Sequence, residues 1–154
     1  MANIGVISDT HGLLRPEAID ALRGSDLIIH AGDIGSPDII PALAKLAPVR
    51  AIRGNVDTEP WARNIPAKLQ FDFNGTKFLV VHSRAELKEK APEAVQVVIF
   101  GHSHEPLIET VGNALFFNPG SAGRRRFSSP IALGRLQIEY GRITPKLIML
   151  KTGS

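Results

Sequence analysis

Short apolar runs rich in valine and isoleucine recur through the first two thirds of the chain. They occupy residues 4–7, 27–29, 49–52, 78–81 and 95–100. Runs of this length are typical of strands that are buried on both faces. Between the first three runs, residues 16–22 and 37–46 begin with proline and carry apolar side chains three and four positions apart, which predicts two helices. The alternation of strands and helices predicts parallel pairing.

After about residue 69 the pattern changes to strands joined by tight turns. Residues 69–73 and 77–81 flank Asn74-Gly75, a pair that favours a two-residue hairpin turn. A second hairpin is predicted near Gly112-Asn113, and a third between residues 131–138 and 143–150. We therefore predict an α/β (α+β) fold in which two mixed β-sheets stack face to face with helices outside.

The composition limits the classes to which the chain can belong. Its 154 residues, of which 44% are hydrophobic, suit a single domain over residues 1–154. The absence of cysteine excludes disulfides, thiolate zinc sites and thiol redox chemistry, and it is compatible with a reducing cytosol. No basic region precedes the first apolar run, which is too short for a signal or membrane segment. We expect a cytoplasmic protein without membrane association.

The charge is mildly basic, with 18 Lys and Arg against 15 Asp and Glu. Basic residues are spread thinly except at Arg124-Arg125-Arg126, which Phe127 follows. A solvated charge run is the commonest outcome for such a cluster. A loop that meets anionic substrate, with Arg124 as a substrate-binding residue, is the alternative, and we do not expect specific nucleic-acid binding.

Residue types that bind metals follow the apolar runs where each run ends. They are Asp9 and His11 after the first run, Asp33 after the second, Asn55 after the third, His82 after the fourth, and His102 and His104 after the fifth. The carboxyl ends of strands in open α/β sheets line the ligand crevice, so these groups can converge although they are distant in sequence. Residues two positions apart in extended segments point the same way, so both members of an Asp-x-His or His-x-His pair can reach one cavity.

Seven oxygen and nitrogen ligands are too many for one tetrahedral ion. They suit two divalent ions with a shared carboxylate, and Asp33 is the expected bridge because it stands alone between the flanking pairs. Each motif taken alone is a common turn sequence, but four of the five histidines fall within these motifs. The fifth, His30, is expected to be partly buried and hydrogen-bonded, and a role in supporting a ligand stays open.

The order Asp-x-His, Gly-Asp, Gly-Asn-x-Asp, His, Gly-His-x-His resembles that of the calcineurin-like metallophosphoesterases over most of the chain. The short length, the opening Ser8-Asp9-Thr10-His11-Gly12 and the later Asn118-Pro119-Gly120-Ser121 resemble the small single-domain bacterial and archaeal phosphodiesterases. These are relatives of the retromer subunit of vacuolar sorting. The resemblance implies a four-layer αββα sandwich and a hydrolase of phosphate esters, with a phosphodiesterase favoured.

The resemblance also implies two metal sites. One ion is expected at Asp9, His11, Asp33 and His104, and the other at Asp33, Asn55, His82 and His102. Manganese is the expected ion, and iron, nickel and zinc are alternatives, because oxygen and imidazole ligands do not discriminate among them. The implied mechanism is in-line attack by a metal-bridging hydroxide, with Asp33, Asn55, His82 and His102 as catalytic residues.

Two positions depart from the family pattern. Val56 stands where many members have a histidine that protonates the leaving alcohol, so esters with leaving groups of low pKa should react faster. The fourth motif reads His82-Ser83-Arg84 in place of His-Gly-His. Arg84 either faces the substrate phosphate or is exposed to solvent.

The expected partners are small-molecule phosphate esters or nucleotides as substrates. Exposed strand edges and an apolar tail are compatible with a homodimer. The alternative function is a non-catalytic or weakly catalytic metal-binding scaffold for protein–protein interaction, as in the retromer relative.

Overall fold

The computed structural model describes residues 1–87, 91–125 and 129–151, whose strands form two mixed sheets of five strands each. The first sheet has the order β10-β9-β1-β2-β3, with bounds β1 (Ala2–Ile7), β2 (Leu27–His30), β3 (Val49–Ala51), β9 (Ala132–Glu139) and β10 (Arg142–Met149). The second has the order β4-β5-β6-β8-β7, with bounds β4 (Lys68–Phe73), β5 (Thr76–Val81), β6 (Val97–Ile99), β7 (Leu107–Val111) and β8 (Ala114–Asn118). The predicted parallel pairing is confirmed for β1, β2 and β3, and the predicted hairpins supply the antiparallel pairs other than that of β1 with β9.

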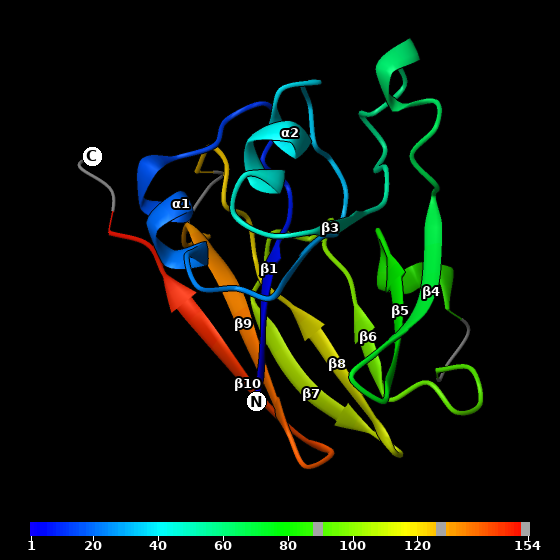
Figure 1. Cartoon of the computed structure of the whole chain (residues 1–154). Helices are drawn as coiled ribbons and strands as arrows, with labels where there is room; N and C mark the ends of the chain where they lie inside the picture. The colour runs from blue at the N-terminus through cyan, green and yellow to red at the C-terminus, as the bar shows by residue number, and fades with distance from the viewer. Residues whose placement is uncertain (88–90, 126–128, 152–154) are drawn as a thin grey trace.

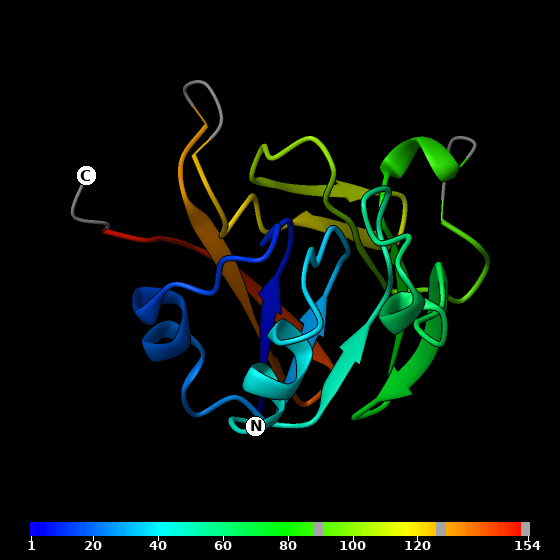
Figure 2. The ribbon, with the colours of Figure 1, turned by 90° about the horizontal axis from the view of Figure 1, so that it is seen from above.

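The α-helices of the described residues cover the outer face of the first sheet (Figures 1 and 2). These are α1 (Pro16–Leu22) and α2 (Ile39–Ala44). Helix α2 is shorter than the segment predicted over residues 37–46. The outer face of the second sheet instead packs against the segment that carries the 3-10 helix η2 (Arg84–Glu86), through Leu87 and Ala91. The other 3-10 helix is η1 (Pro60–Ala62). None of the helices in the described part of the chain is both long and apolar enough to cross a membrane.

The main core lies between the two sheets. It is built from fully buried side chains such as Ile4 and Ile29 of the first sheet and Phe78 and Ile99 of the second. The sheets approach closely at Gly134, where a Cβ atom would collide with the ring of Phe117. The sheets therefore pack as the predicted sandwich, and the alternating pattern of β9 places Leu136 and Ile138 in this core.

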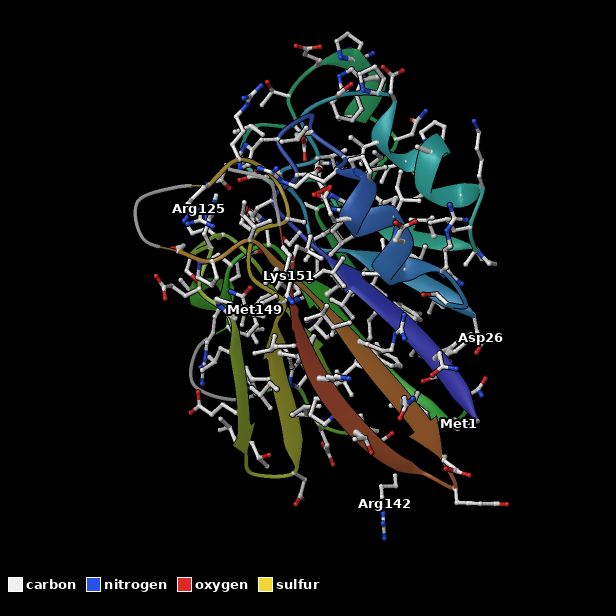
Figure 3. All side chains as sticks on the ribbon, turned by 90° about the vertical axis from the view of Figure 1, so that its left-hand side faces the viewer. Met1, Asp26, Arg125, Arg142, Met149 and Lys151 are labelled. Atoms are coloured by element: carbon white, nitrogen blue, oxygen red, sulfur yellow. The ribbon has the colours of Figure 1, made fainter. Side chains whose placement is uncertain are left out.

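The three hairpin turns all lie at one end of the sandwich, at the bottom of Figure 1. They are Asn74-Gly75, Gly112-Asn113 and Tyr140-Gly141. The carboxyl ends of β1, β2, β3, β5 and β6 lie at the opposite end, which we call the carboxyl end of the sandwich. Figure 3 shows this separation, with Arg142 at the hairpin end and Arg125 toward the carboxyl end. The predicted metal ligands follow these strands, so the fold carries them all to one end.

Candidate metal centre

Six of the seven predicted ligands form two clusters at the carboxyl end. The ligand atoms of Asp9, His11 and His104 lie within 4.8 Å of one another, and so do those of Asp33, His82 and His102. We call these the first and the second cluster. In the first, His104 Nε2 lies 3.5 Å and His11 Nε2 lies 3.9 Å from Asp9 Oδ1. In the second, His82 Nε2 lies 3.1 Å from Asp33 Oδ2.

The two clusters are adjacent. His11 Nε2 of the first cluster lies 3.6 Å from Asp33 Oδ2 of the second, so Asp33 contacts histidines of both. The seventh predicted ligand, Asn55, is exposed and lines a cavity of about 480 Å³ together with His82 and His102. The structure therefore brings all seven predicted residues to one place, with Asp33 between the two groups.

The backbone at these residues is strained. Five of the seven have left-handed backbone, namely Asp9 (φ 55°), His11 (φ 47°), Asp33 (φ 56°), His102 (φ 74°) and His104 (φ 64°). Side-chain-bearing residues pay roughly 1–2 kcal/mol each for this conformation. Such strain persists only where the surrounding contacts enforce it, and it is concentrated at functional sites.

A buried carboxylate that sequence reasoning did not single out holds the loops after β2 and β3 together. Asp57 accepts hydrogen bonds from the backbone N–H groups of Ile34, Gly35 and Gly54, at 2.9, 2.9 and 2.8 Å. Its only sequence signal was its place in the Gly-Asn-x-Asp motif. Because Asp33 and Asn55 lie on these two loops, Asp57 fixes the positions of these two predicted ligands relative to each other.

A second brace lies in the segment after β8. The fully buried Asn118 donates hydrogen bonds from Nδ2 to the carbonyl of Gly101 and the hydroxyl of Ser103, the two residues that flank His102. Its Oδ1 accepts the N–H of Gly120. Ser121 donates from Oγ to the carbonyl of Asp9. The Asn-Pro-Gly-Ser motif thus supports ligands on both the β1 and β6 loops.

His30 lies beneath the site and is fully buried, whereas the sequence predicted partial burial. Its Nδ1 accepts the N–H of Gly32, so its Nε2 carries the proton and donates to Thr10 Oγ1, which in turn donates to the carbonyl of Ile34. Burial lowers the pKa of His30 to about 4, although the charges of Asp57 and Asp33 act in the opposite direction. The predicted hydrogen bonding of His30 is confirmed, and it ties the loops after β1 and β2 together.

The clusters suit cations. Within the described residues, the buried atoms Asp9 Oδ1 and His11 Nε2 have no hydrogen-bond partner. Buried carboxylates without a partner are costly, so a cation at this position would compensate the charge. His82 donates from Nδ1 to the carbonyl of Ala31 at 2.8 Å, so that in the neutral ring the lone pair of Nε2 is directed toward the second cluster.

The comparisons with known proteins agree with this geometry. The family model of the calcineurin-like phosphoesterase superfamily domain matches residues 2–141. The chain belongs to this superfamily. A protein of Methanothermobacter thermautotrophicus named as a probable metallophosphoesterase is 34% identical over 164 aligned positions, which cover 98% of this chain and 93% of the relative.

Two solved structures illustrate the range of the fold in this superfamily. A structure described as a novel archaeal phosphodiesterase has a TM-score of 0.77 and 28% identity, and the match covers 95% of this chain and 99% of that one. Vps29 of Chaetomium thermophilum has a TM-score of 0.76 at 15% identity, with 98% of each chain covered. At that identity the likeness concerns the fold alone.

Enzymes named as metallophosphoesterases depend on metals. The pKa values of the predicted ligands in this chain determine whether protons occupy the positions that a metal would take. Burial raises the pKa of Asp9 to about 6, against the hydrogen bond from Ser8. Burial also opposes ionisation of Asp33, but hydrogen bonds from His82 and from the N–H of Val56 outweigh it and hold the pKa of Asp33 well below its usual range. For His82, the bonds to Asp33 and Ala31 outweigh burial and raise its pKa to about 9. Protons therefore compete with cations for the clusters.

Three other residues singled out in the sequence lie in different surroundings. Arg84 donates from Nη1 to Glu109 at 2.7 Å, and its guanidinium lies 4.6 Å from the centre of the Phe116 ring on the outer face of the second sheet. It does not line the cavity beside His82. Arg124 is exposed and follows Gly123. A Cβ atom added at Gly123 would collide with the carbonyls of Asp9 and Thr10, so this glycine packs closely against the loop after β1. Val56 is 48% exposed beside Asn55. Arg125 is exposed as well, whereas Arg126 and Phe127 lie outside the described residues.

Proposed function

We propose that this protein is a phosphodiesterase with a dinuclear metal centre. The observation that carries the proposal is the pair of adjacent ligand clusters, which meet where His11 Nε2 lies 3.6 Å from Asp33 Oδ2. Under the proposal, one ion is held by Asp9, His11, Asp33 and His104. The other is held by Asp33, Asn55, His82 and His102. The preferred ion is manganese, with iron, nickel or zinc as alternatives, because the donors are oxygen and imidazole nitrogen.

Two divalent ions, when bound, polarise the phosphoryl oxygens and supply an attacking hydroxide by lowering the pKa of a water molecule. The protein's own groups set the conditions for this chemistry. The carbonyl of Ala31 fixes the tautomer and orientation of His82. The carboxylates of Asp9 and Asp33 bring negative charge into a buried place that only cations can neutralise.

The chain also determines which leaving groups react. Val56 stands beside Asn55 and has no proton to give. Without a proton donor at this position, a leaving group that is stable as an anion is favoured, and 4-nitrophenolate, with its low pKa, should leave far faster than an alkoxide. The substrate class is phosphate esters, including nucleotides, and the phosphodiesterase preference is supported by the names of relatives such as the archaeal phosphodiesterase.

A metal-binding scaffold is the second candidate, because Vps29 shares the fold. We rank the enzyme first because all seven ligand positions carry residues that bind metals, whereas a scaffold without catalytic demand is free to lose them.

The test is hydrolysis of bis(4-nitrophenyl) phosphate by protein stripped with a chelator and reloaded with Mn²⁺. We expect metal-dependent release of nitrophenolate, and Asp33→Asn should lower kcat/KM by at least about hundredfold. Asp72→Asn is the matched control, since Asp72 is an exposed carboxylate on β4 and should leave the rate unchanged. Metal binding without hydrolysis would favour the scaffold, and full activity in Asp33→Asn would contradict the assignment of the shared ligand.

A further inference from the structure

The cavity beside the second cluster is large enough for more than a phosphoryl group. Its volume of about 480 Å³ falls within the range of small-molecule sites. His82, His102 and Asn55 line it, together with Arg53, Ala67 and Glu86. A substrate whose phosphorus lies at the clusters would therefore place one of its ester groups here.

Arg53 is held in a fixed position on the wall of this cavity. Its backbone N–H donates to the carbonyl of Pro66 at 2.8 Å, and its Nη1 donates to the carbonyl of Ile65 at 2.6 Å. A guanidinium carries five N–H donors. Within the described part of the chain, the remaining four have no hydrogen-bond partner. The side chain is thus preorganised to donate to oxygen atoms of a ligand.

The other walls offer polar groups and small methyl groups. Glu86 accepts the N–H of Ser83 through Oε2 at 3.0 Å, which leaves its second oxygen as an acceptor. Ala67 and Ala85 contribute only methyl groups, and no Phe, Tyr or Trp is among the described residues that line the cavity. Stacking of a base on one of these three side chains, worth roughly 1–3 kcal/mol, is therefore not provided by the described lining. A guanidinium and a carboxylate among the lining groups match hydroxyl groups, which both accept and donate hydrogen bonds.

We infer that this cavity binds the ester group that stays on phosphorus, and that Arg53 selects a hydroxyl-bearing aliphatic group, such as glyceryl, over an aromatic one. The inference rests on the proposed phosphodiesterase function and adds the class of substrate to it. Arg53 then contacts substrate directly, beyond its bond to Ile65.

Two diesters with the same leaving group test this selection, namely glyceryl 4-nitrophenyl phosphate and phenyl 4-nitrophenyl phosphate. Because both release 4-nitrophenolate, the ratio of their kcat/KM values reports on the retained ester group alone. We expect the glyceryl ester to be favoured about tenfold, chiefly through KM. Arg53→Gln should bring the ratio close to one. Arg63→Gln is the control and should keep the wild-type ratio, since Arg63 lines only the neighbouring cavity.

Each outcome has one meaning. A ratio at or below one in the wild-type protein overturns the inference. So does an Arg53→Gln variant that loses activity equally on both esters, because that result assigns Arg53 only to holding residues 65–66. If neither ester is hydrolysed with Mn²⁺ present, the proposed function itself fails. This result differs from a failure of the selectivity inference, in which both esters are hydrolysed but the glyceryl ester is not favoured.

Discussion

The two ends of the sandwich both contain residues with left-handed backbone, but they place different residue types there. At the hairpin end, these conformations fall on Asn74, Gly75, Gly112, Tyr140 and Gly141, which lie in exposed two-residue turns. At the carboxyl end, they fall on Asp9, His11, Asp33, His102 and His104. Turn residues at the hairpin end serve chain reversal, whereas at the carboxyl end the strained backbone belongs to residues predicted to bind metal.

The surroundings of the glycines differ in the same way. A Cβ atom at Gly75 or Gly141 would meet nothing within 4 Å. A Cβ atom at Gly54 would collide with the backbone nitrogen and carboxylate of Asp33. At the hairpin end, the backbone conformation of each turn is therefore set by local preference. At the carboxyl end it is set by close packing against neighbouring loops.

The largest expected effect is a contrast in activity between two separate variants, each of which adds one methyl group at one end of the sandwich. Gly54→Ala should displace Asp33 and lower kcat/KM for bis(4-nitrophenyl) phosphate by about hundredfold, because displacements of about 1 Å at a reacting site have effects of this size. Gly75→Ala is the matched variant, and it should cost only about 1 kcal/mol of unfolding free energy through backbone strain. Steady-state kinetics and urea unfolding of both variants measure the contrast. Equal losses of activity would show that the two ends do not differ.

The second expected effect is a pH dependence that arises at the carboxyl end. The pKa of His30 falls from 6.5 to about 4 on folding, so the unfolded chain binds a proton that the folded chain refuses. Its contribution to stability is complete above pH 6.5 and is lost as the pH falls toward 4, by roughly 3 kcal/mol. Urea unfolding of metal-free protein between pH 7 and 4 measures it.

The control for this effect is the His30→Gln variant. The pKa values of Asp9 and His82 are raised on folding, so these groups stabilise the folded state at lower pH and act in the opposite direction. The difference in slope between wild type and His30→Gln isolates the contribution of His30. Identical slopes would mean that His30 does not resist protonation.

A smaller effect is expected at the brace formed by Asn118. Asn118→Ala leaves the carbonyl of Gly101 and the N–H of Gly120 without their side-chain partner, at a cost of roughly 2 kcal/mol of unfolding free energy. It should also weaken Mn²⁺ binding, because His102 lies between the two residues to which Asn118 donates. Asn113→Ala, in an exposed hairpin turn, should change both quantities little. Unaltered Mn²⁺ affinity in Asn118→Ala would contradict the role of Asn118 in supporting His102.

The smallest effect concerns proton donation. Val56→His places an imidazole at an exposed position beside Asn55, where the fold can accept it. We compare a phosphodiester whose leaving group is a 4-nitrobenzyl-type alcohol with bis(4-nitrophenyl) phosphate. The activity of the variant on the first substrate should rise about tenfold relative to its activity on the second. Val56→Gln adds polarity without a transferable proton and should not change this ratio. A similar rise in both variants would assign the effect to polarity.

Most of the fold was predictable because the signals are local. The apolar runs predicted the buried strands β1, β2, β5 and β6, and Asn74-Gly75 predicted its hairpin by the backbone preference of two adjacent residues. The seven candidate ligands were predictable because strand ends converge at one edge of a sheet, although their metal-binding roles remain a prediction.

What the sequence did not reveal depends on contacts between distant residues. Asp57 accepts the N–H groups of Ile34 and Gly35 more than twenty positions away, and Asn118 acts on the loop after β6, so the motifs that contain them do not reveal which loops they join. The orientation of Arg84 is decided by Glu109 and Phe116 on neighbouring strands of the second sheet. The place of Arg53 in the cavity wall follows from its bond to Ile65, which the order of residues does not indicate.

The central claim is that the two clusters each hold one cation. The most direct measurement is the number of Mn²⁺ ions bound per chain at saturation, determined by equilibrium dialysis of chelator-stripped protein. The account predicts two ions for the wild-type chain. Saturation at one ion, or no binding, would contradict it.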